Sequence, residues 1–338
     1  MRAELEHWLN QVWYGQQTPP LWLRALVPLY RAAFLLDRSI QQRHPGDLAN
    51  KPILVIGNLT VGGSGKTPLV IRLCRVLQDA GLKVGVASRG YGRSSRGLQH
   101  VNSESDPQQA GDEPLLIAQR ARVPVIVAND RCAAVRALFA RGVDLVIADD
   151  GLQHHRLPRS MEICVVDSSR GFGNGRQLPA GPMREPWQRL QQFDYVVLNG
   201  ETELEAKLPK AVRMTLVPGM LHALGQKLSW RLSQFNGCRA SAVAGIANPE
   251  RFFHSLEQAG LILDRHVWPD HHAYTQDDFA GLNPDYPIIM TEKDAVKCRS
   301  MNLRNAWYLA VDAHLPGDFE LALVRGMMQV VENSRHSE

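Results

Sequence analysis

Long hydrophobic runs are missing from this sequence: no stretch of the 338-residue chain reaches the roughly 18 uncharged apolar residues that a bilayer-spanning helix needs. Glu4 and Glu6 stand where a signal peptide carries basic residues, so we expect no secretory signal. Cysteine is also scarce, with five widely spaced residues and no C-x-x-C pair. This predicts reduced thiols rather than a disulfide framework or a cysteine-based zinc site.

An excess of charge of one sign is lacking as well. Lys and Arg number 38 against 34 Asp and Glu, and a net charge of +4 is too small to indicate a nucleic-acid partner. Apolar residues make up 44% and charged residues 21%, which excludes a disordered, collagen-like or coiled-coil chain. The length is about twice that of a common single domain and predicts one large or two medium-sized domains.

From residue 51 onward, short apolar runs alternate with helical stretches, which predicts an α/β fold with a parallel sheet. The first such domain is expected at 49–204 and a second, smaller one at 237–338, joined by a linker at 205–236 and preceded by a helical region at 1–48. The expected strands are 51–58, 83–90, 124–130, 143–151, 161–169, 193–200, 240–246, 261–268, 287–291 and 306–313, and the expected helices are 68–81, 113–121, 132–142, 249–260 and 318–333. In such sheets ligands bind at the carboxyl ends of the strands.

The segment TVGGSGKT, residues 60–67, lies between the first expected strand and the first helix that follows it. It nearly matches the phosphate-binding P-loop, although Thr60 stands where the first glycine belongs. Glycines let backbone N–H groups surround a phosphate; Lys66 would reach the β and γ phosphates and stabilise the transferred group, and the Thr67 hydroxyl would bind Mg²⁺. The predicted nucleotide-binding residues are Thr60, Val61, Gly62, Gly63, Ser64, Gly65, Lys66 and Thr67.

Asp149 and Asp150 end the apolar run VDLVIADD, as the acids of a Walker B element do. Together with the hydroxyl of the P-loop threonine they are the predicted Mg²⁺ ligands. The sequence TEKD at 291–294 does not fit the Asn/Thr-Lys-x-Asp that reads guanine, so ATP is the expected nucleotide. The adjacent histidines at 154–155 and 271–272 are not expected to bind a metal, since neighbouring side chains point apart and no cysteine partner is evident.

Residues 21–40 have the pattern of an amphipathic helix lying in a membrane surface. Three arginines spaced by seven share one face, Arg24, Arg31 and Arg38. The opposite face carries Trp22, Leu26, Leu29, Ala33, Leu36 and Ile40. A helix packed on its own domain is the alternative, and Pro28 argues against one continuous helix because it lacks a backbone donor.

Seven blocks occur in a characteristic order along the chain. They are GNLTVGGSGKTP (57–68), SRGYGR (88–93), AGDEP (110–114), DDGLQHHRL (149–157), FGNGRQLPAGPMREP (172–186), PDHH (269–272) and MTEKDAVKC (290–298). This set resembles the tetraacyldisaccharide 4'-kinase family of Gram-negative bacteria, and the resemblance covers nearly the whole chain. In that family a P-loop with threonine in place of the first glycine is normal.

The resemblance implies ATP-dependent phosphorylation of the 4'-hydroxyl of tetraacyldisaccharide 1-phosphate, which gives lipid IVA. It implies a P-loop domain and a smaller α/β/α domain joined by a two-stranded β linker. It also implies a peripheral protein at the cytoplasmic face of the inner membrane, attached through its N-terminal helix. An enzyme whose substrate carries four acyl chains must work at a membrane surface, so the membrane-surface reading of residues 21–40 is now favoured. No obligate protein partner is expected.

Functional roles follow from the resemblance position by position. Asp112 matches the catalytic aspartate and His271 the histidine that pairs with it, although Asp112 also suits a helix cap. The remaining matches are Glu185 as a further active-site acid, Arg131 and Arg184 as phosphate-binding residues or else solvated surface, and Tyr91 as a contact to the sugar.

Two other functions remain open from the residues alone. One is a nucleotide-driven switch or metallochaperone, in which no acceptor hydroxyl is phosphorylated; the missing guanine motif and metal-binding cysteine pair argue against it. The other is a kinase for a small soluble metabolite, which would leave the basic amphipathic segment at 21–40 unexplained.

Overall fold

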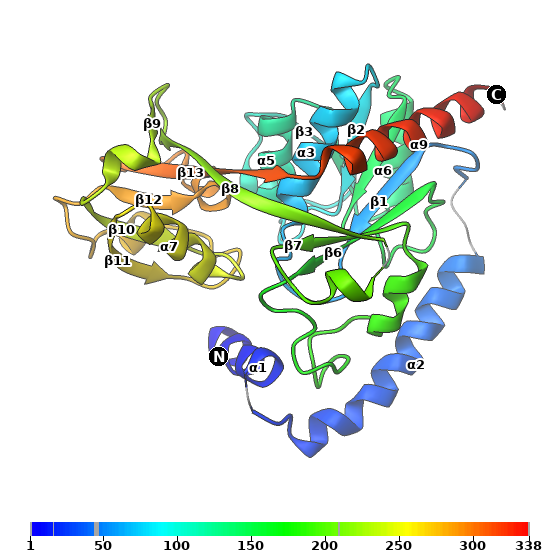
Figure 1. The fold of residues 1–338 in the computed structure, drawn as a ribbon, viewed down its shortest axis with the longest axis horizontal. Helices are drawn as coiled ribbons and strands as arrows, with labels where there is room; N and C mark the ends of the chain where they lie inside the picture. Colours follow the sequence, from blue (N-terminus) through cyan, green and yellow to red (C-terminus); the bar gives the residue numbers. More distant parts are fainter. Residues whose placement is uncertain (1, 16, 44–46, 209, 337–338) are drawn as a thin grey trace.

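One sheet runs through the whole molecule in the computed structural model, which describes residues 2–15, 17–43, 47–208 and 210–336 (Figure 1). The strand order is β11-β10-β12-β13-β8-β7-β6-β1-β5-β2-β4-β3, and β9 pairs with β8. The strands are β1 (Ile53–Gly57), β2 (Val84–Ser88), β3 (Gln99–Val101), β4 (Val125–Val127), β5 (Leu145–Asp149), β6 (Met161–Asp167), β7 (Tyr195–Asn199), β8 (Ala211–Ala223), β9 (Ser229–Arg231), β10 (Arg239–Ala244), β11 (Ile262–Val267), β12 (Ile288–Thr291) and β13 (Ala306–His314). The predicted α/β class with a large parallel sheet is confirmed.

Helices cover both faces of the sheet in the first half of the chain. The helices of the chain are α1 (Arg2–Tyr14), α2 (Leu21–Arg43), α3 (Lys66–Asp79), α4 (Pro107–Ala110), α5 (Asp112–Ala121), α6 (Arg131–Phe139), α7 (Pro249–Gln258), α8 (Glu292–Cys298) and α9 (Gly317–His336), with short 3-10 helices η1 (Trp187–Gln192), η2 (Glu205–Lys207), η3 (Leu232–Phe235) and η4 (Gln276–Phe279). Along β1, Leu54 and Ile56 enter the core formed with α3, α5 and α9. Ile53 and Val55 alternate with them and enter the core formed with α6 on the other face. Both faces of β1 are therefore buried, as a central parallel strand requires.

The segment 205–236, expected to be an irregular linker, contains the long strand β8. Its first residues pair in parallel with β7, and the stretch from Thr215 to Ala223 pairs antiparallel with β13. The two-stranded connection that the resemblance implies is thus β8 with β13, a strand from near the end of the chain. Pro218–Gly219 and mostly exposed or half-buried side chains hide β8 in the sequence, because both weaken the pattern of a strand.

The second half of the chain continues the same sheet with β11, β10, β12 and β13 in parallel. Helix α7 covers one face of these strands and contributes Phe252, Phe253 and Leu256 to an apolar core. The other face is covered by a second core that includes Tyr274 and Phe279. The carboxyl ends of β10 and β11 lead into the loops that carry Ala247 and His271, and β12 leads directly into α8, which carries Lys293.

Helix α9 does not pack with strands β10 to β12, although the expected range 237–338 had placed it in the same domain as these strands. It returns to the first half and packs on α3, with Phe319, Leu323 and Met327 in the same core as β1 (Figure 1). Arg72 of α3 donates two hydrogen bonds, of 2.7 and 2.8 Å, to the carboxylate of Glu320. The last helix of the expected range 237–338 therefore packs on the first core, while the domain boundaries themselves stay a prediction.

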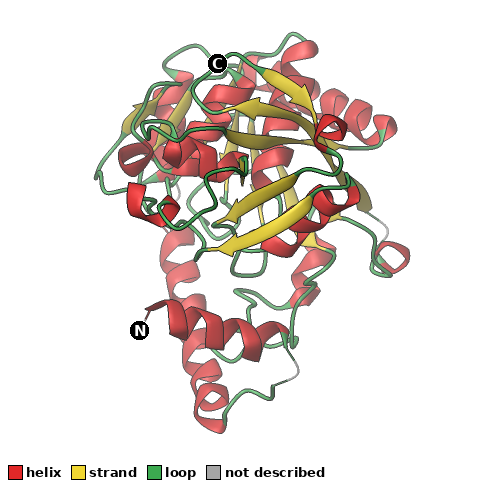
Figure 2. Cartoon of the chain, turned by 90° about the vertical axis from the view of Figure 1, so that its left-hand side faces the viewer, coloured by secondary structure: helices red, strands yellow, loops and turns green. Residues whose placement is uncertain are grey.

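Helices α1 and α2 lie at the margin of the molecule, apart from the sheet (Figures 1 and 2). Contrary to expectation, α2 is continuous through Pro28; Pro28 and Arg24, one turn earlier, are both exposed, so water can bond the carbonyl that the proline leaves free. Leu29 and Leu36 of α2 are 66% and 63% exposed. Within the described ranges, no helix has both the length and the apolar character to span a bilayer.

We expect Leu323→Ala to lower the free energy of unfolding by about 2–5 kcal/mol, because the side chain is fully buried in the core that α9 shares with α3 and β1. Leu321→Ala on the same helix is the control, since Leu321 is 61% exposed and its loss should change stability by about 0.5 kcal/mol or less. Urea unfolding of both variants makes the measurement. Equal effects of the two substitutions would contradict the packing of α9 on the first core.

Candidate functional site

The predicted P-loop connects β1 to α3, as its sequence context indicated. Gly62 and Gly65 have φ values of +104° and +89°, a left-handed backbone that favours glycine. Gly65 caps α3, and a Cβ there would clash with the side-chain amide of Asn199. That amide donates a 3.1 Å hydrogen bond to the carbonyl of Ser64. The loop is therefore held open from β7, with its helix N-terminus available to an anion.

Lys66 lies at the first position of α3 and points toward two acceptors. Its Nζ donates to the side-chain oxygen of Asn58 at 3.1 Å and lies 3.4 Å from the carboxylate of Asp150. Arg184 reaches the same carboxylate at 3.3 Å. Burial alone would raise the pKa of Asp150, but Lys66 and Arg184 lower it well below its usual range. Two cations, Lys66 and Arg184, therefore flank one ionised carboxylate at the carboxyl end of β5 and leave a net positive charge there.

Asp149, the last residue of β5, differs from its neighbour because one carboxylate oxygen is left without a partner. Oδ2 accepts a 3.0 Å hydrogen bond from Ser88, whereas Oδ1 finds no hydrogen-bond partner among the described residues. Burial, together with the charges of Glu113 and Asp150, raises the pKa of Asp149 to about 7. A buried, unpartnered carboxylate oxygen beside the ionised carboxylate of Asp150 is a donor that suits Mg²⁺, so the residues present fit this ion.

Asp112 and His271 come together although 159 positions separate them. Nδ1 of His271 lies 3.0 Å from Oδ2 of Asp112. Asp112 begins α5 in the first half of the chain, and His271, with a positive φ of 62°, lies in the loop after β11. The expected contact is present; the catalytic role stays a prediction.

The alternative for Asp112, a helix cap, fits the structure less well. The N-cap of α5 is Gly111, with a φ of +91° and no side-chain cap. Asp112 is the first residue of α5 and accepts a 2.9 Å hydrogen bond from the backbone N–H of Glu113. Its carboxylate therefore contacts both the helix start and His271.

The remaining predicted residues surround these groups. Glu185 is buried and accepts a 3.0 Å hydrogen bond from Gln153. Arg131 is buried as well, which contradicts the alternative of solvated surface, and burial together with Arg89 lowers its pKa. Tyr91 is exposed, and its ring lies at a tilt of 54° to the His271 imidazole, with ring centroids 5.1 Å apart.

A cavity of about 230 Å³ opens between the two halves of the chain beside the P-loop. The first half contributes the P-loop and Glu113, and the second contributes Arg251, Asp270 and Lys293. Sequence reasoning did not select Arg251, Lys293 or Asn199 as functional residues. The signal for Asn199 was its place at the end of an expected strand, and Lys293 was considered only as part of a guanine motif.

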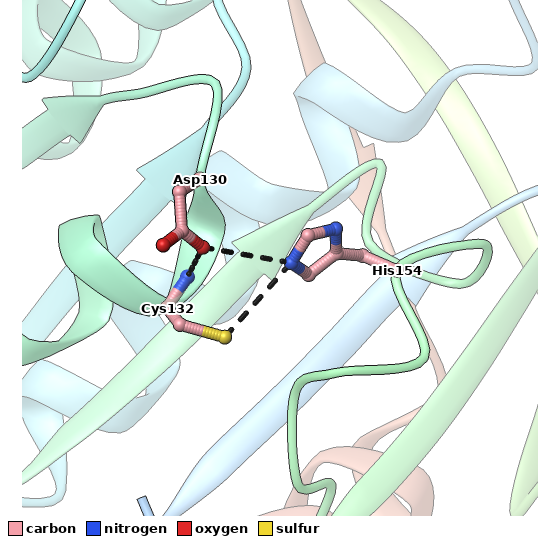
Figure 3. Close-up of side chains that lie close together, drawn as sticks. All are labelled: Asp130, Cys132 and His154. Atoms are coloured by element: carbon pink, nitrogen blue, oxygen red, sulfur yellow. Dashed lines mark hydrogen bonds and ion pairs between the residues drawn. The ribbon is translucent and has the colours of Figure 1, made fainter. Parts of the chain in front are cut away.

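His154 has the cysteine neighbour that the sequence did not reveal (Figure 3). Its Nε2 lies 3.9 Å from Sγ of Cys132 and 4.0 Å from Oδ1 of Asp130. Asp130 already caps α6 by accepting the Cys132 N–H at 3.0 Å, and guanidinium groups of Arg136 and Arg156 lie 3.9 Å from its carboxylate. These contacts satisfy the carboxylate as a helix cap amid positive charge, so we assign no metal to this group.

The position of the loop after central strand β1, with an acidic pair at the end of the adjacent strand β5, places the chain in the P-loop class of phosphate-binding α/β proteins. A family model described as tetraacyldisaccharide-1-P 4'-kinase matches residues 20–327. The chain therefore belongs to the tetraacyldisaccharide-1-P 4'-kinase family, as the sequence blocks predicted.

Relatives and a solved structure agree with this membership. The tetraacyldisaccharide 4'-kinase of Hahella chejuensis is 46% identical, and the match covers 92% of this chain and 94% of the relative. That of Halorhodospira halophila is 44% identical, with 94% and 95% covered. A crystal structure of LpxK from Aquifex aeolicus in complex with ATP has a TM-score of 0.71 and 25% identity, and covers 91% of this chain and 99% of that chain.

We expect Gly65→Ala to weaken the binding of a fluorescent nucleoside triphosphate by roughly tenfold or more, because a displaced loop loses backbone hydrogen bonds to phosphate worth about 1.5–3 kcal/mol each. Gly81→Ala, at the other end of α3, is the matched control: Gly81 has a φ of +87°, but a Cβ there meets nothing within 4 Å. Both variants should lose about 1–2 kcal/mol of stability from the left-handed backbone. Equal nucleotide affinity in the two variants would contradict the assignment of the loop.

Proposed function

We propose that this chain transfers the γ-phosphate of ATP to the 4'-hydroxyl of tetraacyldisaccharide 1-phosphate and so forms lipid IVA in lipid A biosynthesis. The observation that carries the proposal is the 3.0 Å contact between Asp112 and His271, beside the cavity that the P-loop lines. Family membership supports the reaction, and this contact supports a base for an acceptor hydroxyl.

The chain's own residues supply binding, charge and a proton acceptor. The P-loop amides and Lys66 hold the phosphates, and Arg131 and Arg184 add positive charge for the transferred group. Asp112 accepts the proton of the sugar hydroxyl. Burial alone would raise the pKa of Asp112, but Lys293 and His271 lower it well below its usual range, so the carboxylate is ionised at neutral pH. Glu185 and Tyr91 are assigned to the walls of the same site.

Thr67, Asp149 and Asp150 would hold Mg²⁺, which supplies positive charge at the phosphate oxygens when bound. Asp150 already pairs with Lys66 and Arg184, whereas Asp149 retains an oxygen without a partner among the described residues. We therefore assign direct contact with the ion to Asp149 first.

The test of this function uses γ-labelled ATP, tetraacyldisaccharide 1-phosphate in detergent micelles and thin-layer separation, with Lys66→Ala as the inactive blank. Label in a more polar lipid product supports the proposal. Release of labelled inorganic phosphate without labelled lipid would favour a nucleotide-driven switch. Transfer to a soluble sugar in preference to the lipid would favour a metabolite kinase.

Asp112→Asn and His271→Ala should each lower kcat by about 10²–10⁴, with little change in the KM for ATP, because each removes part of one proton-transfer unit. The double variant should be scarcely slower than the slower single variant, since residues that act as a unit are not additive. Steady-state kinetics of the three variants make the measurement. Fully multiplicative losses, or normal rates with a lower Tm alone, would contradict the assignment.

Attachment to the cytoplasmic face of the inner membrane through α2 is also part of the proposal. The side chains of Leu26, Leu29 and Leu36 lie on the exposed side of α2, while Leu23 is buried. Arginines accompany this apolar surface, as in helices that lie at an anionic membrane. A substrate with four acyl chains supports this location.

Replacing Leu26, Leu29 and Leu36 with Ser should move the protein from liposomes of anionic lipid to the supernatant in a sedimentation assay. Each leucine contributes roughly 1.5–3 kcal/mol of apolar burial. The control replaces three exposed leucines elsewhere, Leu98, Leu228 and Leu321. Equal loss of binding in both triple variants, or none in either, would contradict attachment through α2.

A further inference from the structure

Lys293 lies at the centre of a charge cluster that the proposed reaction does not yet use. Its Nζ lies 3.0 Å from Oε1 of Glu113, 3.1 Å from Oδ1 of Asp270 and 3.2 Å from Nε2 of His271. The carboxylate of Asp112 is 3.9 Å away. An ammonium group has three N–H donors and no acceptor, so these three close contacts use all of them.

The backbone that carries Lys293 is fixed by buried hydrogen bonds on either side. Thr291, the N-cap of α8, accepts the N–H of Asp294 at 3.1 Å. The carboxylate of Asp294, which is fully buried, accepts the Thr291 hydroxyl at 2.6 Å and the Gly245 N–H at 2.9 Å. The ammonium position is therefore set by the second half of the chain, whereas Glu113 belongs to α5 of the first half.

The contact with His271 determines where the imidazole can carry a proton. Because the ammonium only donates, Nε2 of His271 must accept, and the single proton of a neutral imidazole then lies on Nδ1. Nδ1 is the nitrogen that faces Asp112 at 3.0 Å. An imidazolium would bring a second positive N–H against the ammonium.

We propose that Lys293 is a positioning residue that opposes protonation of His271 at Nε2 and so directs the imidazole proton to Nδ1, toward Asp112, while it joins the second half of the chain to Glu113 across the cavity. The inference rests on the proposed function only where it concerns rate. Its structural part, the tautomer and titration of His271, holds for any reaction at this site.

The direction in which the loss of Lys293 should move the pKa of His271 follows from the groups that face the imidazole. These are Asp112 from α5, Asp270 from its own loop, Lys293 from α8 and the ring of Tyr91. Burial lowers the pKa of His271, the Asp112 hydrogen bond raises it and Lys293 lowers it, with a net raised value. Without the ammonium, the first proton bound by the Asp112–His271 pair should bind at higher pH.

The experiment compares Lys293→Met with Lys293→Arg in the full chain, and Lys207→Met serves as a control at an exposed lysine. Nitrogen-15 NMR of histidine-labelled protein gives the tautomer and titration of His271, which His271→Gln identifies by difference. In Lys293→Met the titration, and the acid limb of the kcat/KM profile, should move up by roughly one to three pH units. Lys293→Arg, which keeps the charge, should restore the acid limb even if kcat stays lower.

Two further variants complete the test. Lys293→Gln is neutral but polar and replaces Lys293→Met if the latter fails to fold, with the same upward shift expected. Glu113→Gln removes the partner across the cavity but keeps the ammonium at Nε2, and should leave the tautomer of His271 unchanged.

An unchanged titration of His271 in the neutral variants, or an equal shift in Lys293→Arg, overturns the proposal. The NMR result needs no turnover, so it stands even if the native chain phosphorylates no lipid, and the two failures remain distinguishable.

Discussion

The antiparallel pairing of β8 with β13 is the constraint on which the candidate site depends. Thr215 to Ala223 of β8 lie opposite Trp307 to His314 of β13, so one continuous sheet connects the two halves of the chain. Arg120 of α5 reinforces the junction by binding Glu292 of α8 and Asp312 of β13, each at 2.5 Å. The loops at the ends of both sets of strands therefore face a shared cavity, and His271 can reach a carboxylate 159 positions away.

Charge compensation is the second constraint, because the site gathers many ionised groups where water is scarce. Asp150 is balanced by Lys66 and Arg184, and Asp112 by the charge of Lys293 together with a hydrogen bond from His271. Buried charges are tolerated only when paired in this way. Asp149 is different: its unpartnered oxygen and raised pKa indicate a carboxylate that lacks a cation. The arrangement suits a site that gains both anionic phosphates and a metal ion when it is loaded.

Local patterns placed the candidate phosphate loop correctly between a strand and a helix. The apolar run before residues 60–67 and the helix after them identify a P-loop without tertiary information, because phosphate binding by backbone amides is a local property. The contact of Asp112 with His271 came from the family resemblance, since no spacing rule joins such distant residues. Strand β8 was not predicted because Pro218–Gly219 interrupts the pattern of a strand. Helix α9 was assigned to the wrong core because sequence order does not show that the chain returns to a core formed earlier. Lys293 was overlooked because its role depends on the groups that its ammonium binds, and no sequence pattern identifies them.

The N-terminal helices are part of the site as well as of the surface. The hydroxyl of Tyr14 in α1 donates a 3.1 Å hydrogen bond to the carbonyl of Val61 in the P-loop. The hydroxyl of Tyr30 in α2 donates a 3.0 Å hydrogen bond to the carbonyl of Arg184, whose side chain holds Asp150. These two hydrogen bonds connect α1 and α2 directly to backbone of the candidate phosphate site. In the proposed function the acyl chains of the substrate would lie beside α2, and these two hydrogen bonds would connect that surface to the backbone around the phosphate site.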